Sequence, residues 1–376
     1  MLVPDGLALY DATAARASRD VLAAYSTSFG LGTRLLGARA RRDIEAVYAL
    51  VRLADEVVDT YRGPVAAAEL DELEEQTRRA LGTGFSTNLV VHAFARTARR
   101  TGIDRGEIDP FFASMRADLS VHEHDRSSYE QYVYGSAEVV GVMCLKVFLA
   151  ADRPDGAGRP PAPDAATVDG ARALGAAFQK INFLRDLGAD SGDLGRAYFP
   201  GLDPRALTPA QVRDVLAEIG DDVARARAAM PRLPLRARCA VAATLALYDG
   251  LLVRLARTDP AELARRRVRV PDPQKLLLVG RAVATTLAED RRRGGRGQAA
   301  AGSSRRPSSS PPSTTRARSP RGDAAAPTPT ADMTSTRGAV TTSATSTSGT
   351  GTATSASGTG SATSTTSTST TEAGRG

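Results

Sequence analysis

The sequence predicts an all-α protein, and three observations support this fold class. Between about Ala14 and Arg291, apolar residues recur every three or four positions in long stretches rich in Ala, Leu, Arg and Glu, which is the pattern of amphipathic helices. Alternation of polar and apolar residues is not sustained over the length of a strand, which argues against a Rossmann fold or another α/β sheet. Gly and Pro cluster at only a few points between these stretches. We therefore expect long helices that surround a central cavity.

Five clusters of Gly and Pro predict where these helices end. They are Arg62–Pro64, Leu81–Gly84, Asp152–Asp164, Ser191–Pro204 and Val270–Pro273. A further pair of glycines lies in Phe29–Gly32, but the third glycine of a dinucleotide-binding loop is absent. We interpret this Gly-x-Gly as a bend in the chain.

Composition divides the 376 residues into a globular body, residues 1–290, and a tail, residues 291–376. The tail consists mostly of Ser, Thr, Gly, Ala, Pro and Arg, and it contains no Leu, Ile, Phe, Tyr or Trp from which a core could be built. We expect the tail to be disordered, either as a natural linker or as the frame-shifted end of a GC-rich gene. The body is then the part that carries the function.

The net charge of +7 resides in the tail and not in the body. Residues 291–376 contain eleven Arg and three acidic residues, a net charge of +8, so residues 1–290 have a net charge of −1. A nearly neutral body without a basic stripe gives no support to a role in binding nucleic acid.

The cysteines and histidines suggest neither a disulfide framework nor a zinc site. Cys144 and Cys239 lie in apolar contexts, and no Cys/His spacing resembles a metal motif. His122 and His124 do not share a helix face, so we interpret them as part of a solvated polar turn and assign them no metal. The N-terminal residues lack the basic start and apolar core of a signal peptide, and no apolar run reaches the length of a membrane span. We expect a cytoplasmic protein that is soluble or at most peripheral to the inner face of the membrane.

The first of two aspartate pairs at helical spacing is Asp55 and Asp59. Asp43 is positioned to cap a helix that runs to about Thr60, and the apolar residues of that helix fall on one side of it. Asp55 lies in the middle of the apolar side, and Asp59 lies on its flank together with Arg52. The pair therefore points inward or toward a cleft and not into open solvent.

Burying two carboxylates four residues apart is unfavourable unless cations neutralise them. One explanation is an ordinary ion pair between Asp55 and Arg52, which lies one turn earlier. The other explanation is a bound metal ion. This helix alone does not decide between the two.

The second pair is Asp186 and Asp190, on a helix predicted from about Ala171 to Asp190 that is apolar nearly all round. Its one polar stripe is formed by Gln179, Asn182, Asp186 and Asp190, which fall within about 80° of one another on a helix. Taken alone, this stripe is also compatible with a structural hydrogen-bond network.

Two acidic pairs at the same spacing on two buried helices favour metal binding. Mg²⁺ keeps several waters and is usually held by one or two carboxylates together with substrate phosphates, so carboxylate pairs that face each other across a helical cavity suit a bound diphosphate. Arg52 and Arg185 would add direct charge to the phosphate oxygens. The residues thus predict a metal-dependent enzyme that acts on a diphosphate.

Five segments resemble the head-to-head prenyl synthases, the phytoene/squalene synthase family, over about Ala14–Leu287. In the family's order they are Tyr25–Phe29 (YSTSF), Arg52–Asp59 (RLADEVVD), Tyr134–Met143 (YGSAEVVGVM), Gln179–Asp190 (QKINFLRDLGAD) and Gly195–Pro200 (GRAYFP). A single Asp-x-x-x-Asp occurs by chance in many helices, whereas this ordered set is specific.

The resemblance implies an isoprenoid-synthase-type orthogonal helical bundle and a set of functional residues. Metal ligands for Mg²⁺, with Mn²⁺ as a substitute, are implied at Asp55, Asp59, Asn182, Asp186 and Asp190. Substrate and diphosphate contacts are implied at Tyr25, Ser26, Ser28, Phe29, Arg52, Gln179, Asn182, Arg185, Tyr248 and Arg267. Catalytic roles are implied for the four pair aspartates, Arg52, Tyr48 and Tyr134, and Lys275 matches a position that closes the cavity in relatives. For Tyr48, core packing with a satisfied hydroxyl is an equally good interpretation.

Three positions depart from the commonest family pattern. Tyr25 stands where many members have His, Glu56 replaces a third Asp, and Ala189 replaces an acid before Asp190. The four pair aspartates are retained, so we still expect metal binding.

The reaction implied by the resemblance starts when metal ions draw diphosphate from one allylic substrate and the double bond of a second substrate attacks the cation. A cyclopropyl diphosphate follows, and a second ionisation gives a linear product, by hydride addition in squalene synthase or proton loss in phytoene synthase. The middle motif in its Gly135–Gly141 form (GSAEVVG) looks most like bacterial phytoene synthases, which condense two geranylgeranyl diphosphates without NADPH in carotenoid biosynthesis.

Two alternatives remain at this point. The nearer one is a dehydrosqualene, hydroxysqualene or squalene synthase acting on two farnesyl diphosphates, since chain length depends on the depth of the cavity. The remote one is a noncatalytic helical binding protein, whose signature would be the loss of pair aspartates. Because substrates and product are lipids, we also expect peripheral membrane contact.

Overall fold

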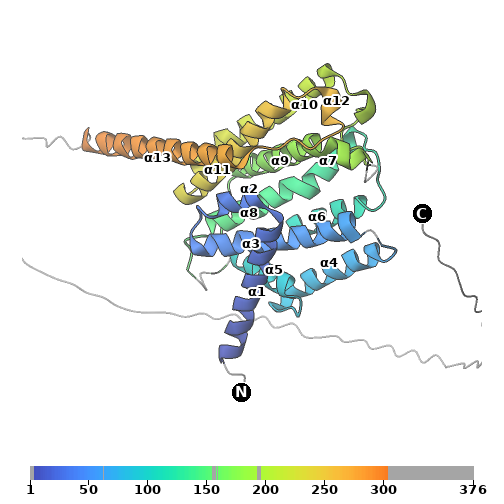
Figure 1. The fold of residues 1–376 in the computed structure, drawn as a ribbon. Coiled ribbons are helices and arrows are strands. Elements are labelled where there is room, and N and C mark those ends of the chain that lie inside the picture. Colours follow the sequence, from blue (N-terminus) through green and yellow to red (C-terminus); the bar gives the residue numbers. More distant parts are fainter. Residues whose placement is uncertain (1–3, 62, 155–157, 159, 193–195, 304–376) are drawn as a thin grey trace, which may run out of the picture. The chain divides into compact units, whose positions relative to one another are not determined.

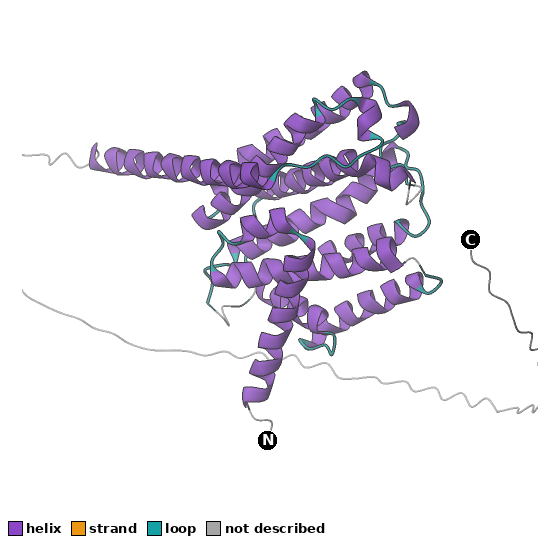
Figure 2. Ribbon diagram, viewed as in Figure 1, coloured by secondary structure: helices purple, strands orange, loops and turns teal. Residues whose placement is uncertain are grey.

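The computed structural model describes residues 4–61, 63–154, 158, 160–192 and 196–303, with side chains except those of residues 4, 5, 27, 28, 189–192, 204 and 294–303. Every regular element within these ranges is a helix, apart from one isolated bridge between Glu123 and Ala197 (Figure 2). The prediction of an all-α protein is confirmed. The elements are α1 (Pro4–Tyr25), α2 (Thr27–Thr33), α3 (Ala38–Glu56), η1 (Val57–Tyr61), α4 (Ala66–Thr83), α5 (Leu89–Thr101), α6 (Arg105–Ala117), α7 (Arg126–Val133), η2 (Tyr134–Glu138), α8 (Val139–Leu149), α9 (Ala165–Gly192), η3 (Pro204–Ala206), α10 (Pro209–Ala229), η4 (Met230–Arg232), α11 (Leu235–Leu255), α12 (Pro260–Leu263) and α13 (Asp272–Ser303).

Two apolar clusters hold these helices together, and the helices that form them are arranged as Figure 1 shows. The first cluster joins α3, α4, α5, α6 and α8 around the buried rings of Phe94, Phe111 and Phe112. The second joins α7, α9, α10, α11 and α12 around Ile181 and Leu184. Helix α8 packs against α9 and so connects the two clusters.

Local chemistry accounts for several helix ends, one of them at a predicted break. Gly84 ends α4 with a φ of 81°, a left-handed conformation that favours glycine, as predicted for Leu81–Gly84. Asn88 caps α5, and Asp104 forms a reciprocal capping box with Glu107 at the start of α6. The predicted cap at Asp43 is wrong: α3 begins at Ala38, and Asp43 is buried within it.

Glycines allow the helices around the cavity to approach closely. A β-carbon at Gly141 would lie 2.2 Å from the carbonyl oxygen of Ala171, and one at Gly175 would lie 2.3 Å from that of Ala137. The final glycine of the YGSAEVVG motif thus serves the contact between α8 and α9. The interpretation of Gly30 and Gly32 as a bend is wrong, because both lie inside the short helix α2.

Two π-turns interrupt otherwise regular helices. η1 continues α3 and contains Asp59, and η2 lies between α7 and α8 and begins at Tyr134. π-turns often mark functional positions because they re-aim side chains and leave backbone groups outside the regular ladder. Both of these turns carry a residue that the sequence singles out.

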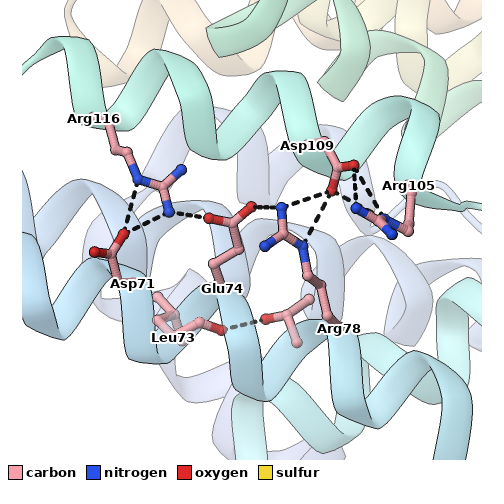
Figure 3. A network of polar contacts seen from close by, with 8 residues as sticks. Asp71, Leu73, Glu74, Arg78, Arg105, Asp109 and Arg116 are labelled. Carbon is pink, nitrogen blue, oxygen red and sulfur yellow. Dashed lines mark hydrogen bonds and ion pairs between the residues drawn. The ribbon is translucent and has the colours of Figure 1, made fainter. Parts of the chain in front are cut away.

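A ladder of ion pairs fastens α6 to α4 (Figure 3). Arg116 on α6 contacts Asp71 at 2.6 Å and also Glu74, which is almost fully buried. Arg78 contacts the same Glu74 from the other side and reaches Asp109 at 3.2 Å. The ladder fixes the last turn of α6, two residues before the C-cap residue Asp118.

The stretch Arg126–Leu149, which joins α7, η2 and α8, is long and apolar enough to cross a membrane by length and composition alone. This corrects the prediction that no apolar run reaches that length. Because 56% of its apolar window is buried and Val139 and Met143 belong to the first cluster, packing inside the protein accounts for its composition.

Helix α13 packs along α11 and ends at Ser303, beyond the predicted body boundary at residue 290. Thr286 is the last buried side chain among the residues of α13 whose side chains the structure describes, and Asp290 pairs with Arg238 on α11 at 2.7 Å. Residues 304–376, which make up most of the predicted disordered tail, lie outside the described residues.

Candidate active site

A cavity of about 460 Å³ lies among α2, α3, η2, α8, α9, η4 and α11. Most of its wall is apolar, with Leu36, Val140, Leu174 and Leu233 among the lining residues. One part of the wall is polar, and ten of the residues predicted from the sequence line the cavity. They are Tyr25, Ser26, Phe29, Tyr48, Arg52, Gln179, Asn182, Arg185, Tyr248 and Arg267.

The first aspartate pair adjoins this cavity through Arg52. Arg52 lines the cavity and forms ion pairs with Asp55 and Glu56 on the same helix, while its guanidinium carbon lies 4.5 Å from the ring centre of Tyr25. The ordinary ion pair that the sequence offered as one explanation therefore exists. It does not neutralise the pair, because burial and the neighbouring Asp59 carboxylate raise the pKa of Asp55 to about 7 despite Arg52.

Asp59 is held from behind by a buried arginine. Arg196, which follows α9 in the chain, donates to Asp59 Oδ1 at 2.6 Å. Arg196 is 5% exposed, whereas the side chain of Asp59 is 32% exposed. The carboxylate therefore contacts a fixed cation on one side and keeps an accessible face.

In the second aspartate pair, the structure describes the side chain of Asp186 but not that of Asp190. Asp186 on α9 accepts from Arg185 Nε at 3.0 Å and from Arg267 Nε at 2.8 Å. Both arginines also line the cavity. Asp190 lies in α9, but its side chain is outside the described residues, as is that of Ser28 in α2.

The polar groups around the cavity show whether this site suits a divalent metal ion. Asn182 Oδ1 and Arg52 Nε are buried without a hydrogen-bond partner among the residues that the structure describes, and both residues line the cavity, where a bound ligand could satisfy them. Among the described side chains, no three Cys, His, Asp or Glu groups converge into a ready-made cage. Mg²⁺ seldom uses such a cage, since substrate phosphates complete its coordination shell. The residues fit a metal ion that binds together with a diphosphate.

Aromatic rings occupy the cavity wall next to these charges. Tyr48 stacks on Phe29 with ring centres 5.7 Å apart, and Phe178 stacks on Tyr248 at 3.9 Å. Burial raises the pKa values of the Tyr48 and Tyr248 hydroxyls, so both stay neutral. Tyr48 packs on a neighbour and also lines the cavity, so the packing interpretation of its ring is confirmed and its catalytic role stays a prediction.

Five described residues implied by the resemblance are not among the residues that line the cavity: Asp55, Asp59, Asp186, Tyr134 and Lys275. Tyr134 packs beside the first apolar cluster, with Arg172 5.3 Å from its ring centre. Lys275 pairs with Asp272 at 2.8 Å in the first turn of α13. Neither is positioned here to contact a ligand in the cavity.

Sequence reasoning missed other residues of the site. Ser136 lines the cavity from η2, and its buried hydroxyl has no hydrogen-bond partner in the part of the chain that the structure describes. Arg196 lies in a segment that the resemblance quoted without giving it a role. The interpretation of His124 as part of a solvated turn is wrong, because its ring is buried against Tyr132 and Tyr198, whereas His122 is exposed.

Comparisons with known proteins show the family of this chain. The model of the squalene/phytoene synthase family matches residues 22–274. The 15-cis-phytoene synthase of Synechocystis sp. is 32% identical over 69% of this chain and 81% of its own length. The 15-cis-phytoene synthase of Enterobacter agglomerans is 27% identical over 70% of this chain and 94% of its own length.

A solved structure shows the same fold. The crystal structure of a dehydrosqualene synthase in complex with ligand superimposes with a TM-score of 0.61 at 20% sequence identity, covering 74% of this chain and 98% of the other. At that identity the likeness supports the fold and not the substrate. With the family model matched over two thirds of the sequence, this chain belongs to the squalene/phytoene synthase family.

Proposed function

We propose that this chain is a 15-cis-phytoene synthase, a prenyltransferase that joins two geranylgeranyl diphosphates head to head in carotenoid biosynthesis. The reaction passes through a cyclopropyl intermediate, prephytoene diphosphate. The observation that carries the proposal is an apolar cavity in whose wall three arginines, Arg52, Arg185 and Arg267, stand directly against aspartates. The relatives named phytoene synthase support the choice of product.

The two parts of the cavity suit the two ends of a prenyl diphosphate. The isoprenoid chain gains roughly 25 cal/mol for each Å² of apolar surface that it buries against residues such as Leu174 and Val140. The diphosphate has three guanidinium groups within its reach, and guanidinium matches phosphate oxygens in a bidentate manner. This arrangement fixes which end of the substrate enters the apolar part.

The chain's own groups protect the cationic intermediates. The apolar wall excludes water, which would otherwise capture a carbocation. The rings of Phe29, Tyr48, Phe178 and Tyr248 line the cavity, and an aromatic face next to a cation attracts it by about 0.5–2 kcal/mol. The neutral Tyr48 and Tyr248 hydroxyls do not add negative charge that would trap the cation as an ether.

Asp55, Asp59, Asn182, Asp186 and Asp190 are the residues that we propose hold Mg²⁺, or Mn²⁺ in its place. The metal would supply positive charge to the departing diphosphate. Arg52 and Arg185 orient the same diphosphate, and no NADPH is needed for a product formed by proton loss. We also propose a cytoplasmic location with peripheral membrane contact, because the substrates and product are lipids.

The test is incubation of the purified full chain with Mg²⁺ and either geranylgeranyl or farnesyl diphosphate, with and without NADPH, followed by identification of the hydrocarbon. We expect phytoene from geranylgeranyl diphosphate without NADPH. A C30 product formed only from farnesyl diphosphate would replace phytoene synthase by the dehydrosqualene or squalene type. No product from either substrate would remove the enzyme assignment altogether.

Substitution of the aspartates tests the site within the same assay. Asp55→Ala and Asp186→Ala are each expected to lower turnover by at least about 10²-fold while circular dichroism shows unchanged helicity. Glu130→Ala is the matched control, because Glu130 also pairs with an arginine, Arg126, but lies on the surface of α7. Normal turnover in either site variant would exclude that aspartate from the metal site.

A further inference from the structure

A buried polar cluster lies behind the first aspartate pair. Its members are Arg196, Asp118, Tyr132 and Tyr198. Arg196 donates to Asp59 Oδ1 at 2.6 Å, to the carbonyl of Val58 at 3.2 Å and to the carbonyl of Asp118 at 2.9 Å. A single guanidinium thus holds both the carboxylate and the backbone of the π-turn η1.

Asp118 anchors the cluster from the end of α6. Its carboxylate accepts a hydrogen bond from the Tyr132 hydroxyl at 2.7 Å and another from the Tyr198 hydroxyl at 3.2 Å. It also lies 3.6 Å from Arg196 Nη1, so it neutralises the buried guanidinium. Because α6 is fastened to α4 by the ion-pair ladder of Figure 3, this anchor is itself fixed.

The cluster also reaches the helix that carries the second aspartate pair. The ring of Tyr198 stacks on Phe183 of α9, with ring centres 4.1 Å apart and an interplanar angle of 10°. Phe183 precedes Asp186 by three residues, less than one helical turn. The position of Asp59 is therefore tied to the position of Asp186 through Arg196, Tyr198 and Phe183.

None of the four members is among the described residues that line the cavity. Asp59 is not among those lining residues either, but its side chain is 32% exposed, whereas that of Arg196 is 5% exposed. Residues behind a metal ligand commonly fix its orientation, and their substitution typically weakens metal binding or activity by about 10–100-fold.

We propose that Arg196 is a positioning residue, which together with Asp118 and Tyr198 holds the Asp59 carboxylate in place within the proposed metal–diphosphate site. The inference rests on the proposed function and adds residues to which the motifs gave no role. It gives the GRAYFP segment a structural role, because Arg196 and Tyr198 both belong to it.

The test measures Mn²⁺ binding by electron paramagnetic resonance in the presence of inorganic diphosphate, with no turnover involved. Arg196→Lys keeps the charge and loses the fork that spans Asp59 and the two carbonyls. We expect it to weaken Mn²⁺ binding by about 10–100-fold and to raise the Mg²⁺ concentration for half-maximal turnover by a similar factor. Turnover at saturating Mg²⁺ should fall much less, because the residue does not contact substrate.

The matched control is Arg100→Lys. Arg100 likewise pairs with a buried carboxylate, that of Asp43, and donates to the carbonyl of Ala150 at 3.0 Å, but it does not line the cavity. We expect Mn²⁺ binding within about twofold of wild type in this variant. Equal weakening in both variants would show a general effect of loosening the core and would overturn the proposal.

A double-mutant cycle with Asp59→Asn separates positioning from other effects. If Arg196 acts through Asp59, Arg196→Lys has little further effect on Mn²⁺ binding once Asp59 is replaced. Additive losses would contradict the proposal. Should Arg196→Lys fail to fold, Tyr198→Phe takes its place, because it keeps the ring stack on Phe183 and removes only the hydroxyl; a few-fold weakening is then expected.

The outcomes also separate this inference from the proposed function. A wild-type chain that neither binds Mn²⁺ with diphosphate nor forms product would remove both. A wild-type chain that does bind and turn over, while Arg196→Lys binds Mn²⁺ equally well, would remove the positioning role alone.

Discussion

Arg267 and Asp186 form an ion pair next to the cavity, with Arg267 Nε 2.8 Å from Asp186 Oδ1. Asp186 lies on α9, whereas Arg267 lies in the segment between α12 and α13, 81 residues further along the chain. The same arginine lines the cavity, so it is placed to contact both a carboxylate of the proposed metal site and a bound diphosphate.

Replacement of Arg267 is therefore expected to weaken substrate binding. Arg267→Gln removes one charged hydrogen-bonding group, worth about 1.5 kcal/mol, and should raise KM for the prenyl diphosphate by about tenfold with a smaller change in kcat. Steady-state kinetics at saturating Mg²⁺ measure this. Arg266→Gln is the control, because its exposed side chain pairs with Glu262 and does not line the cavity. An unchanged KM in Arg267→Gln would place the diphosphate elsewhere.

The raised pKa of Asp55 predicts how the stability of the metal-free protein depends on pH. The folded-state pKa of about 7 exceeds the value of about 3.9 expected in the unfolded chain, so the folded state binds the proton more tightly. The contribution of this carboxyl group to stability is full below the unfolded pKa and is lost as pH rises through the folded pKa. Asp55→Asn removes the titration, so the stability of wild type relative to this variant should fall between about pH 5 and pH 8.

Urea unfolding of both proteins in EDTA at these two pH values gives the comparison. The difference between wild type and Asp55→Asn is the relevant quantity, because most other titrating groups cancel in it. A difference that stays constant, or that grows with pH, would show that Asp55 does not have a raised pKa in the folded chain.

Local sequence was sufficient to predict the helical class, the loop at Gly84 and the inward direction of Arg52, Gln179 and Asn182. These features depend on periodicity and on backbone preferences within a few residues. The role of Asp43 was not predictable in this way. Its partners Thr97 and Arg100 lie more than fifty residues away on α5, and without them a short acid near a helix start looks like a cap.

The polar cluster behind Asp59, formed by Arg196, Asp118, Tyr132 and Tyr198, could not be predicted from the sequence for the same reason. Arg196 contacts Asp59 across 137 residues of sequence and Tyr198 contacts Asp118 across 80. No periodicity encodes such pairs. The π-turn at Val57–Tyr61 was also not predicted, because one extra residue in a helical turn leaves the apolar spacing nearly unchanged.

The glycine at the end of the YGSAEVVG motif is expected to be required for packing. Gly141→Ala would place a β-carbon 2.2 Å from the Ala171 carbonyl oxygen, where backbone must move, so we expect a loss of about 1–3 kcal/mol in stability. Gly220→Ala is the matched control in the interior of α10, where a β-carbon meets nothing within 4 Å. There the better helix former should add about 0.5–1 kcal/mol. Chemical denaturation of both variants measures the contrast, and a stable Gly141→Ala would mean that α8 and α9 are not packed as closely as described.

We expect the part of the chain needed for folding and activity to end just after Asp290, which contacts Arg238. Asp290 on α13 accepts from Arg238 at 2.7 Å, and the Arg238 side chain is only 11% exposed. Truncation after Arg293 keeps this pair and the buried Thr286, so phytoene formation and the midpoint of thermal unfolding should match those of the full chain. Truncation after Ala288 removes Asp290 and leaves a mostly buried guanidinium without its carboxylate, which should cost about 1–3 kcal/mol. Equal stability of the two truncations would show that the pair does not set the boundary, and a large loss of activity on truncation after Arg293 would give residues 294–376 a role in function.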